Sequence, residues 1–314
     1  MKKVVVFGGG SGMSTLLSGL KFFPLDVTAV ITVADDGRST GNLREEFSMP
    51  AMGDVRKVIS NMSDVDPKIK ALLEYRFNTD SDLDGHALGN LILVAMYNIT
   101  GSMKESISYL SKLLNVPFKI LPISEDNLKL LGESTDGEII EGEHNITESP
   151  KKIKKVFYEK EPKVLKEVIK EIEKADLIIL SMGSIFTSVL PNIICKEVLS
   201  TIDNSNAKII YTCNAVTQPG ETDGFRVSDH IKMLNKYLGK KKIDAVVASY
   251  TKIPKEIVKK YETAEQKDLV PIDEMNIDKL GCKLISGDLL TIKDNMIRHK
   301  GLKLATAIFN YIME

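Results

Sequence analysis

The opening segment, residues 1–34, constrains the fold more than any other part of the chain. A valine-rich apolar run over 2–7 predicts a buried strand, which runs into Gly8-Gly9-Gly10-Ser11-Gly12. Apolar residues at helical spacing follow over 14–22, and a second buried strand is expected over 27–34. A strand, a glycine turn, a helix and a strand form a βαβ unit, which implies a parallel sheet with helices on both faces.

The remaining chain continues this alternation. Further buried strands are expected over 119–122, 176–181, 207–214 and 244–249. Helices are expected over 54–62, 68–75, 90–99, 103–114, 162–175, 228–237, 254–260 and 300–313. The polar stretch 125–160 contains β-like fragments and predicts a small antiparallel insertion. Because no linker is evident, we predict one α/β domain over 1–314: a doubly wound, mostly parallel Rossmann-like sheet with helices on both faces and a small β insertion.

Composition excludes several classes of partner. The chain has 314 residues, with 42 Lys and Arg against 43 Asp and Glu, and this balance lacks the basic field that nucleic-acid binding needs. Its 3 cysteines form no CxxC pair, which disfavours a zinc site and fits a reducing compartment. The N-terminus does not have the pattern of a signal peptide, and no apolar run reaches about 18 residues. We therefore predict a cytoplasmic protein without membrane insertion.

The glycine-rich loop after the first strand is the first candidate for ligand binding. Gly9, Gly10, Ser11 and Gly12 permit close approach of the backbone to an anion, and the next helix offers its N-terminal N–H groups. The loop is therefore a candidate phosphate cradle; a tight turn with helix–strand packing is the alternative. The loop lacks the third glycine of GxGxxG, and no GK[ST] follows, so it matches neither the dinucleotide motif nor a P-loop.

Acidic and hydroxyl residues follow the second strand. Asp35 and Asp36 can meet a ribose hydroxyl or hold a divalent cation, and Arg38 and Ser39 add further polar groups; a helix cap with a turn is the alternative. Further along, His86 and Asn90 are spaced i, i+4 and share a helix face, from which they can hydrogen-bond a ligand together. A lone histidine is more often structural.

Later strand ends carry the same kind of loop. The candidate ligand-binding residues there are Ser184, Asn214, Thr217, Gln218, Glu221 and Thr222. Ligands of open parallel sheets bind outside the carboxyl ends of the strands, so the shared location of these loops predicts a polar, phosphate-bearing ligand. No serine lies in a GxSxG elbow, and we assign no catalytic residue.

Several segments together resemble the YvcK/CofD-like family. They are VVVFGGGSGMSTLLSGLK, TAVITVADDGRSTGNLR, GDVRKVISNM, GHALGNLILVAM, GSIFTSVLPN and TQPGETDGFRVSDH. The late segments KYETAEQ and MIRHKGLKLA are closer to the YvcK branch, the gluconeogenesis factors. The chain departs from the usual family pattern at Arg38, where a second glycine is usual, and at Ser181-Met182, where Gly-Pro is usual.

The resemblance implies a Rossmann-like fold and a bacterial protein that binds UDP-N-acetylglucosamine and is required for normal cell shape during gluconeogenic growth. It also implies that Tyr261 and Arg298 contact the UDP-sugar, and that no cofactor is required. The CofD branch implies the alternative, a 2-phospho-L-lactate transferase that uses a guanosine diphosphate carrier, with Asp35 and Asp36 holding Mg²⁺. A homodimer is left open. An NAD-dependent oxidoreductase is a third alternative, disfavoured by the missing glycine.

Overall fold

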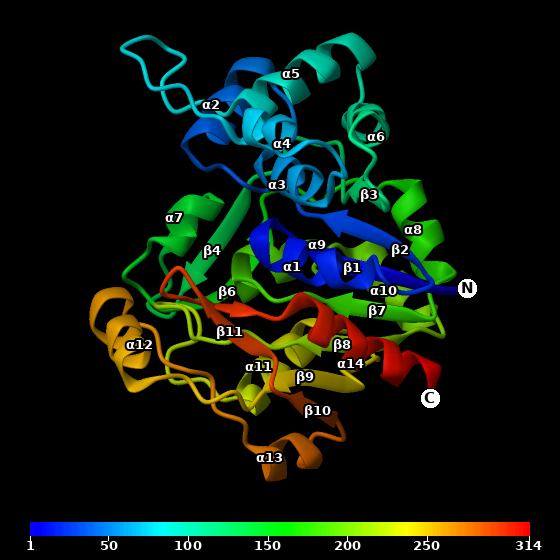
Figure 1. Cartoon of the computed structure of the whole chain (residues 1–314), viewed down its shortest axis with the longest axis vertical. Helices are drawn as coiled ribbons and strands as arrows, with labels where there is room; N and C mark the ends of the chain where they lie inside the picture. The colour runs from blue at the N-terminus through cyan, green and yellow to red at the C-terminus, as the bar shows by residue number, and fades with distance from the viewer.

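Seven parallel strands form the centre of the molecule in the computed structural model, which describes residues 1–314 (Figure 1). Their order across the sheet is β10-β9-β8-β7-β1-β2-β3. The strands are β1 (Lys2–Gly8), β2 (Leu25–Ile31), β3 (Lys119–Pro122), β7 (Leu177–Leu180), β8 (Lys208–Thr212), β9 (Ala245–Ser249) and β10 (Lys283–Gly287). Every neighbouring pair is parallel, so the predicted doubly wound α/β sheet is confirmed.

Both faces of this sheet are buried, which explains the uninterrupted apolar runs in the sequence. Val5 and Phe7 of β1 belong to one apolar core, whereas Val4 and Val6 belong to a second core on the other face. Successive side chains of a strand point to opposite faces, so a strand covered on both sides needs apolar residues at every position.

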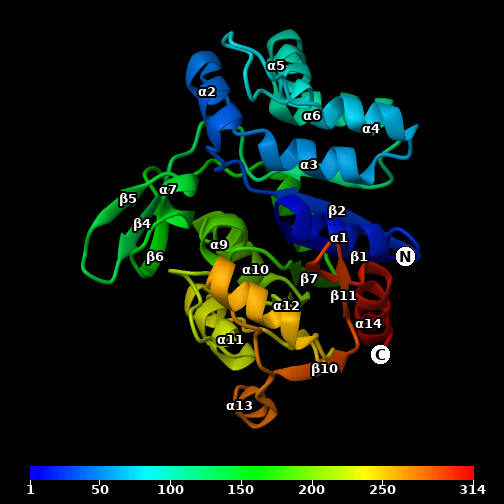
Figure 2. The same ribbon diagram turned by 60° about the vertical axis from the view of Figure 1, so that its left-hand side comes forward.

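Helices cover the two faces in separate sets. One face packs against α8 (Lys166–Glu173), α9 (Leu190–Ile193), α10 (Lys196–Asn204), α11 (Val227–Tyr237) and α13 (Glu274–Lys279). The other face and its outer layer contain α1 (Gly10–Leu20), α3 (Gly53–Met62), α4 (Pro67–Glu74), α5 (Leu88–Thr100), α6 (Met103–Leu113) and α14 (Gly301–Met313). Figure 2 shows α3 to α6 as a layer above α1 and β2.

The first and last helices touch through their backbones. A Cβ on Gly19 of α1 would collide with the carbonyl oxygen of Gly301, and a Cβ on Gly301 would collide with the carbonyl oxygen of Thr15. The rings of Phe23 and Phe309 extend this contact, with centroids 4.8 Å apart. The close approach fixes α14 against the helix that follows the glycine-rich loop.

The predicted insertion around 125–160 is an antiparallel sheet of three strands, in the order β5-β4-β6. It consists of β4 (Leu130–Ser134), β5 (Ile139–Glu141), α7 (Glu143–Thr147) and β6 (Ile153–Tyr158). The backbone N–H of His144 in α7 donates to Asp36 Oδ1 at 2.7 Å. This bond attaches the insertion to the loop that follows β2.

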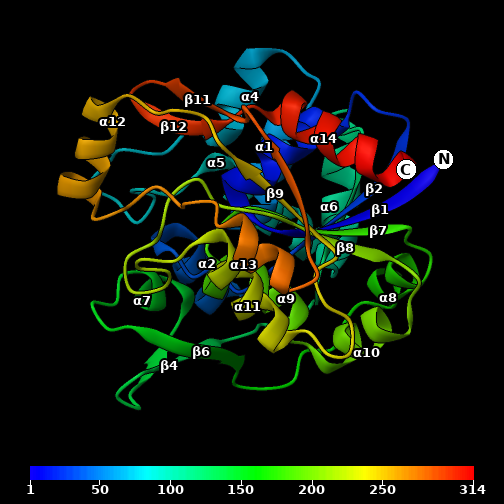
Figure 3. The same cartoon turned by 90° about the horizontal axis from the view of Figure 1, so that it is seen from below.

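Several elements were missed by the sequence analysis. A helix, α2 (Arg38–Phe47), begins in the loop after β2, and its polar composition hides it because Leu43 is its only deeply buried apolar side chain. The chain also forms a hairpin of β11 (Leu290–Lys293) and β12 (Met296–His299), beside α12 (Lys255–Lys260) (Figure 3). The helix expected over 162–175 is shorter, and α10, α13 and β10 were not expected.

No single helix has the length and apolar composition needed to cross a membrane. The two helical segments 185–193 and 196–204 together have the required length and apolar composition, but they meet at a bend of 68°.

Candidate functional site

The chain reverses direction across the sheet beside β1. It passes from β1 to β2 and β3 on one side and then returns to β7 on the other, so the loops after β1 and β7 diverge. Such a switch point is where open α/β sheets bind ligands. A cavity of about 280 Å³ lies there, and we call it the polar cavity because no apolar side chain lines it. Its lining is Gly9, Gly10, Ser11, Gly12, Thr32, Asp35, Asp54, Lys57, Glu143, Thr147, Gly183, Ser184, Thr187, Ser188 and Gln218.

The close packing of the glycine-rich loop matches the tight-turn alternative, while the phosphate cradle stays a prediction. A Cβ on Gly12 would collide with the carbonyl oxygen of Met182, so close packing against the loop after β7 requires glycine there. The same loop lines the polar cavity, and α1 begins at Gly10 without a side-chain cap. Uncapped N–H groups in the first turn of a helix attract anions.

Three carboxylates from three different elements face the polar cavity: Asp35 after β2, Asp54 on α3 and Glu143 on α7. Burial raises the pKa of Asp54, and the neighbouring Asp35 adds to this effect, while Lys57 Nζ opposes it from 3.1 Å away. Burial, reinforced by Asp35, raises the pKa of Glu143 to about 7. Asp54 was interpreted as a helix cap, and Glu143 was not identified because no helix was expected within the insertion.

Asp35 and Asp36 point to different places. Asp35 lines the polar cavity, whereas Asp36 lines a separate polar recess of about 400 Å³ beside the insertion and accepts the N–H of His144. No three His, Cys, Asp or Glu side chains are arranged to hold a metal ion. Mg²⁺ commonly uses only one or two protein carboxylates together with water and substrate phosphates, and Asp35 with Asp54 fits that requirement.

The loop after β7 is held by a buried carboxylate. Glu221 is 1% exposed, and both of its oxygens accept the Ser184 hydroxyl at 2.7 Å. Ser184 Oγ in turn accepts the backbone N–H of Thr187 at 2.9 Å. Burial raises the pKa of Glu221 to about 7, against the opposing bond from Ser184. Ser184 lines the polar cavity, whereas Glu221 lies outside the lining and fixes the Ser184 hydroxyl by a hydrogen bond.

The loop after β8 is joined to the loop after β7 by Asn214. Its Oδ1 accepts the N–H of Gly183 at 3.0 Å, and its Nδ2 donates to the Gly183 carbonyl at 2.7 Å. Thr217 Oγ1 accepts from Asp268 N, and Thr222 Oγ1 accepts from Gln218 N, each at 2.8 Å. Of the residues predicted in this loop, only Gln218 lines the polar cavity; Thr217 and Thr222 fix the loop's shape.

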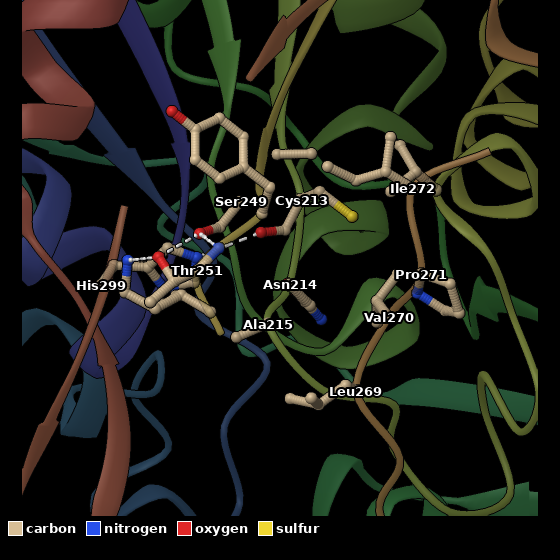
Figure 4. A pocket seen from close by; sticks show the side chains of 14 residues that line it. Cys213, Asn214, Ala215, Ser249, Thr251, Leu269, Val270, Pro271, Ile272 and His299 are labelled. Atoms are coloured by element: carbon tan, nitrogen blue, oxygen red, sulfur yellow. Dashed lines mark hydrogen bonds between the residues drawn. The ribbon is translucent and has the colours of Figure 1, made fainter. Parts of the chain in front are cut away.

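A second, mostly apolar cavity of about 360 Å³ lies beyond Asn214, at the ends of β8 and β9 (Figure 4). Its polar groups include Ser249, Thr251 and His299, and the two hydroxyls lie 2.8 Å apart. Burial lowers the pKa of His299 to about 4, so its ring is neutral at pH 7, and Nε2 lies 3.2 Å from the Cys213 carbonyl oxygen. The sequence analysis missed Ser249 and Thr251, although both lie at the end of a predicted strand.

Neither Tyr261 nor Arg298 lines this apolar cavity. Tyr261 is 7% exposed and packs against Leu290 and Ile297. Its hydroxyl accepts the N–H of Ile297 at 3.0 Å, which anchors the β11–β12 hairpin. Arg298 is exposed on that hairpin. The two residues therefore meet at one hairpin: Arg298 is part of it, and Tyr261 packs against it.

The remaining predicted residues form a third group. Arg38, Ser39 and Asn90 line a polar pocket of about 190 Å³ between α2, α3 and α5. Asn90 Nδ2 donates to Ser39 Oγ at 3.1 Å, and Ser39 Oγ lies 3.2 Å from His86 Nδ1. His86 is buried behind this pair and does not line the pocket.

These features define a doubly wound α/β protein with a glycine-rich loop at its switch point. The family model described as 2-phospho-L-lactate transferase CofD matches residues 4–290, and the chain belongs to the CofD family. It is 42% identical to the gluconeogenesis factor of Bacillus subtilis, over 99% of this chain and 98% of that protein. It is 43% identical to the gluconeogenesis factor of Halalkalibacterium halodurans, over 98% of this chain and 95% of that protein.

A solved structure has the same fold. The crystal structure of a Bacillus halodurans member of the UPF0052 family matches with a TM-score of 0.94 and 42% identity, covering 98% of this chain and 99% of that chain. The predicted family is therefore confirmed, and the chain is a homologue of the gluconeogenesis factors.

Proposed function

We propose that the protein is a nucleotide-sugar-binding factor that acts in gluconeogenic growth and cell-shape maintenance, with UDP-N-acetylglucosamine as its ligand. The observation that carries the proposal is the junction of two unlike cavities at the Asn214–Gly183 contact. The polar cavity suits a diphosphate, and the apolar cavity suits the flat and partly apolar end of a nucleotide sugar. The relatives named gluconeogenesis factor support the cellular role.

The charge of the polar cavity sets a condition on this binding. A diphosphate beside Asp35, Asp54 and Glu143 is repelled unless the carboxylates are neutralised. Lys57 supplies one positive charge, and the raised pKa of Glu143, about 7, allows that group to be protonated near neutral pH. A bound Mg²⁺ would neutralise the remainder, with Asp35 and Asp54 as its protein ligands.

Titration calorimetry with UDP-N-acetylglucosamine, with and without Mg²⁺, tests the proposal. We expect saturable binding that Gln218→Ala weakens, because Gln218 lines the polar cavity. Arg298 lines neither cavity, so Arg298→Ala tests whether the ligand extends to the hairpin as the family resemblance implies; a contact there would make the variant weaken binding by about 1.5–3 kcal/mol, the scale of a charged hydrogen bond. Lys293→Ala is the matched control, because it removes an exposed positive charge from the same hairpin. Absence of binding at millimolar ligand would refute the proposal.

The three carboxylates favour a second candidate function, a CofD-type transferase. Mg²⁺ held by Asp35 and Asp54 would offset the charge that develops as the P–O–P bond of the donor breaks and the nucleoside monophosphate leaves, and Glu143, with a pKa of about 7, is in the range suited to a general base that takes the proton of the acceptor hydroxyl. Incubation with a guanosine-diphosphate-activated 2-phospholactate and a deazaflavin acceptor tests it. Product that disappears in Asp54→Asn would support this function, and no product with Mg²⁺ present would exclude it.

A further inference from the structure

A buried arginine without a partner lies on α3, beside the polar cavity. Arg56 is 6% exposed, and its Nε has no hydrogen-bond partner. Its side chain forms no ion pair; the nearby Glu74 instead accepts the hydroxyl of Ser60 at 2.9 Å. Burial lowers the pKa of Arg56, and the neighbouring cation Arg76 lowers it further, while the charges of Glu74, Asp35 and Asp54 oppose both effects. A buried donor without a hydrogen-bond partner is costly, and a ligand that accepts from it would remove that cost.

Arg56 faces the pocket of about 190 Å³ described above, which we call the cationic pocket. Its charged lining is Arg38, Arg56, Lys57 and Arg76 against Asp35 alone. Three of the four cations have partners: Arg38 pairs with Asp84, Lys57 with Asp54, and Arg76 donates to the Gly85 carbonyl oxygen. Arg56 is the cation left for a ligand.

Two other groups of the cationic pocket also lack hydrogen-bond partners: the side-chain oxygen of Asn90 and the first N–H groups of α2. Asn90 is 2% exposed, and its Oδ1 has no hydrogen-bond partner although its Nδ2 donates to Ser39. The pocket also contains the start of the ten-residue helix α2, whose N-cap Gly37 offers no side-chain cap. Asp35 Oδ1 is occupied by the N–H of Gly37 at 3.0 Å, which leaves the first-turn N–H groups of α2 available to an anion.

We propose that the cationic pocket binds a small organic anion, a phosphate ester or a carboxylate, that also carries a hydroxyl group. The anion satisfies Arg56 and the N-terminus of α2, and the hydroxyl donates to Asn90 Oδ1. The volume fits a small metabolite rather than a nucleotide. The pocket shares Asp35 and Lys57 with the polar cavity, so a ligand here lies next to a ligand there. The proposal does not depend on the identity of the nucleotide.

Calorimetry with three probes tests the proposal: inorganic phosphate, glycerol 3-phosphate and glycerate. We expect binding in the millimolar range or tighter, with glycerol 3-phosphate preferred over inorganic phosphate because it carries a hydroxyl. Preference for glycerol 3-phosphate or for glycerate decides between the phosphate and carboxylate forms of the ligand.

Arg56→Met is expected to weaken binding at least about tenfold. Lys68→Met is the matched control, because it removes an exposed, unpaired charge from the adjacent α4. Asn90→Ala is expected to remove the preference for the hydroxylated probes while inorganic phosphate still binds, and it replaces Arg56→Met as the decisive variant if that protein fails to fold.

Three results would overturn the proposal: no binding of any probe at about 10 mM, equal binding to wild type and Arg56→Met, or displacement of glycerol 3-phosphate by UDP-N-acetylglucosamine. The last result would place both ligands in one site. Failure of UDP-N-acetylglucosamine to bind, with glycerol 3-phosphate still binding, would refute the proposed function and leave this inference standing.

Discussion

Two buried arginines on consecutive helices differ in whether the chain supplies hydrogen-bond partners for their guanidinium groups. Arg44 on α2 is 8% exposed and Arg56 on α3 is 6% exposed. The guanidinium of Arg44 donates to Asn127 Oδ1 at 3.2 and 2.7 Å, to the Asp35 carbonyl at 3.1 Å, and to the Leu128 carbonyl. Arg56 has no such bonds. Arg44 joins the loop after β2 to the insertion, whereas the N–H groups of Arg56 face the cationic pocket.

The comparison separates a structural charge from a candidate binding charge. At Arg44 the hydrogen bonds within the chain offset the cost of desolvating the guanidinium, because each of its nitrogens donates to an oxygen. At Arg56 the carboxylates of Glu74, Asp35 and Asp54 act only at a distance and no oxygen accepts from Nε, so a ligand has the most to contribute there. The predictions that follow test this difference, from the largest expected effect to the smallest.

Arg44→Met is expected to destabilise the protein by about 3–5 kcal/mol, because it leaves buried carbonyl and amide oxygens without donors. Urea denaturation followed by circular dichroism measures the loss. Arg44→Lys serves as the comparison variant, since it retains the charge but loses the fork of donors. A decrease in the free energy of unfolding of less than about 1 kcal/mol would contradict the structural role of Arg44.

A buried acid provides a test based on pH. Unfolded Glu221 titrates near 4.5 and the folded group near 7, so the folded state holds a proton that the unfolded state has released across that window. The contribution of this group to stability is therefore fully present below pH 4.5 and is lost as pH rises to 7, by up to about 3 kcal/mol.

Denaturation of wild type and Glu221→Gln at a series of pH values measures this contribution. The stability of wild type relative to the variant should fall between pH 4.5 and 7 and then level off. Glu262→Gln, an exposed acid, should follow wild type throughout. Parallel curves for wild type and Glu221→Gln would show that Glu221 titrates normally.

Glycerol 3-phosphate at ten times its dissociation constant is expected to stabilise wild type by about 1.4 kcal/mol, because a ligand that binds only the folded state shifts unfolding by mass action. Thermal unfolding with and without the ligand measures this shift. Arg44→Lys should retain the stabilisation, and Arg56→Met should lose it. Equal shifts in all three proteins would mean that the two arginines do not differ in function.

Without ligand, Arg56→Met is expected to leave stability unchanged or raise it by about 1 kcal/mol, the opposite sign to Arg44→Met. The same denaturation experiment compares the two variants. A loss of several kcal/mol would show that Arg56 is part of the architecture, and the contrast between the two helices would then disappear.

The sequence predicts the sheet well because burial on both faces leaves a plain signal. The apolar run Val4–Phe7 of β1 indicates a central strand, and the loops after the strands identify the edge where the cavities lie. The hairpin was missed because most of its residues are exposed. Asp294 and Asn295, with φ of 53° and 55°, are the turn signal that marks it.

The cationic pocket could be predicted only in part. Arg38, Ser39 and Asn90 were predicted as ligand-binding residues, whereas Arg56 lies in a quoted segment but was given no role, and Arg76 lies just beyond an expected helix. What distinguishes Arg56 from Arg44 is the absence of partners, which depends on how α2, α3 and α5 pack. Spacing along the chain carries no information about that arrangement.

The glycine contact between α1 and α14 has a consequence for how the protein is made. Leu16, Leu17 and Leu20 of α1 are fully buried in the core that also contains Leu304 and Ile308 of α14. During synthesis α1 leaves the ribosome long before α14, so the part of α1 that packs against α14 stays uncovered while the sheet between them is translated. Contacts between segments so distant in sequence form late. We therefore expect the side of α1 that packs against α14 to be covered only after α14 has been synthesised.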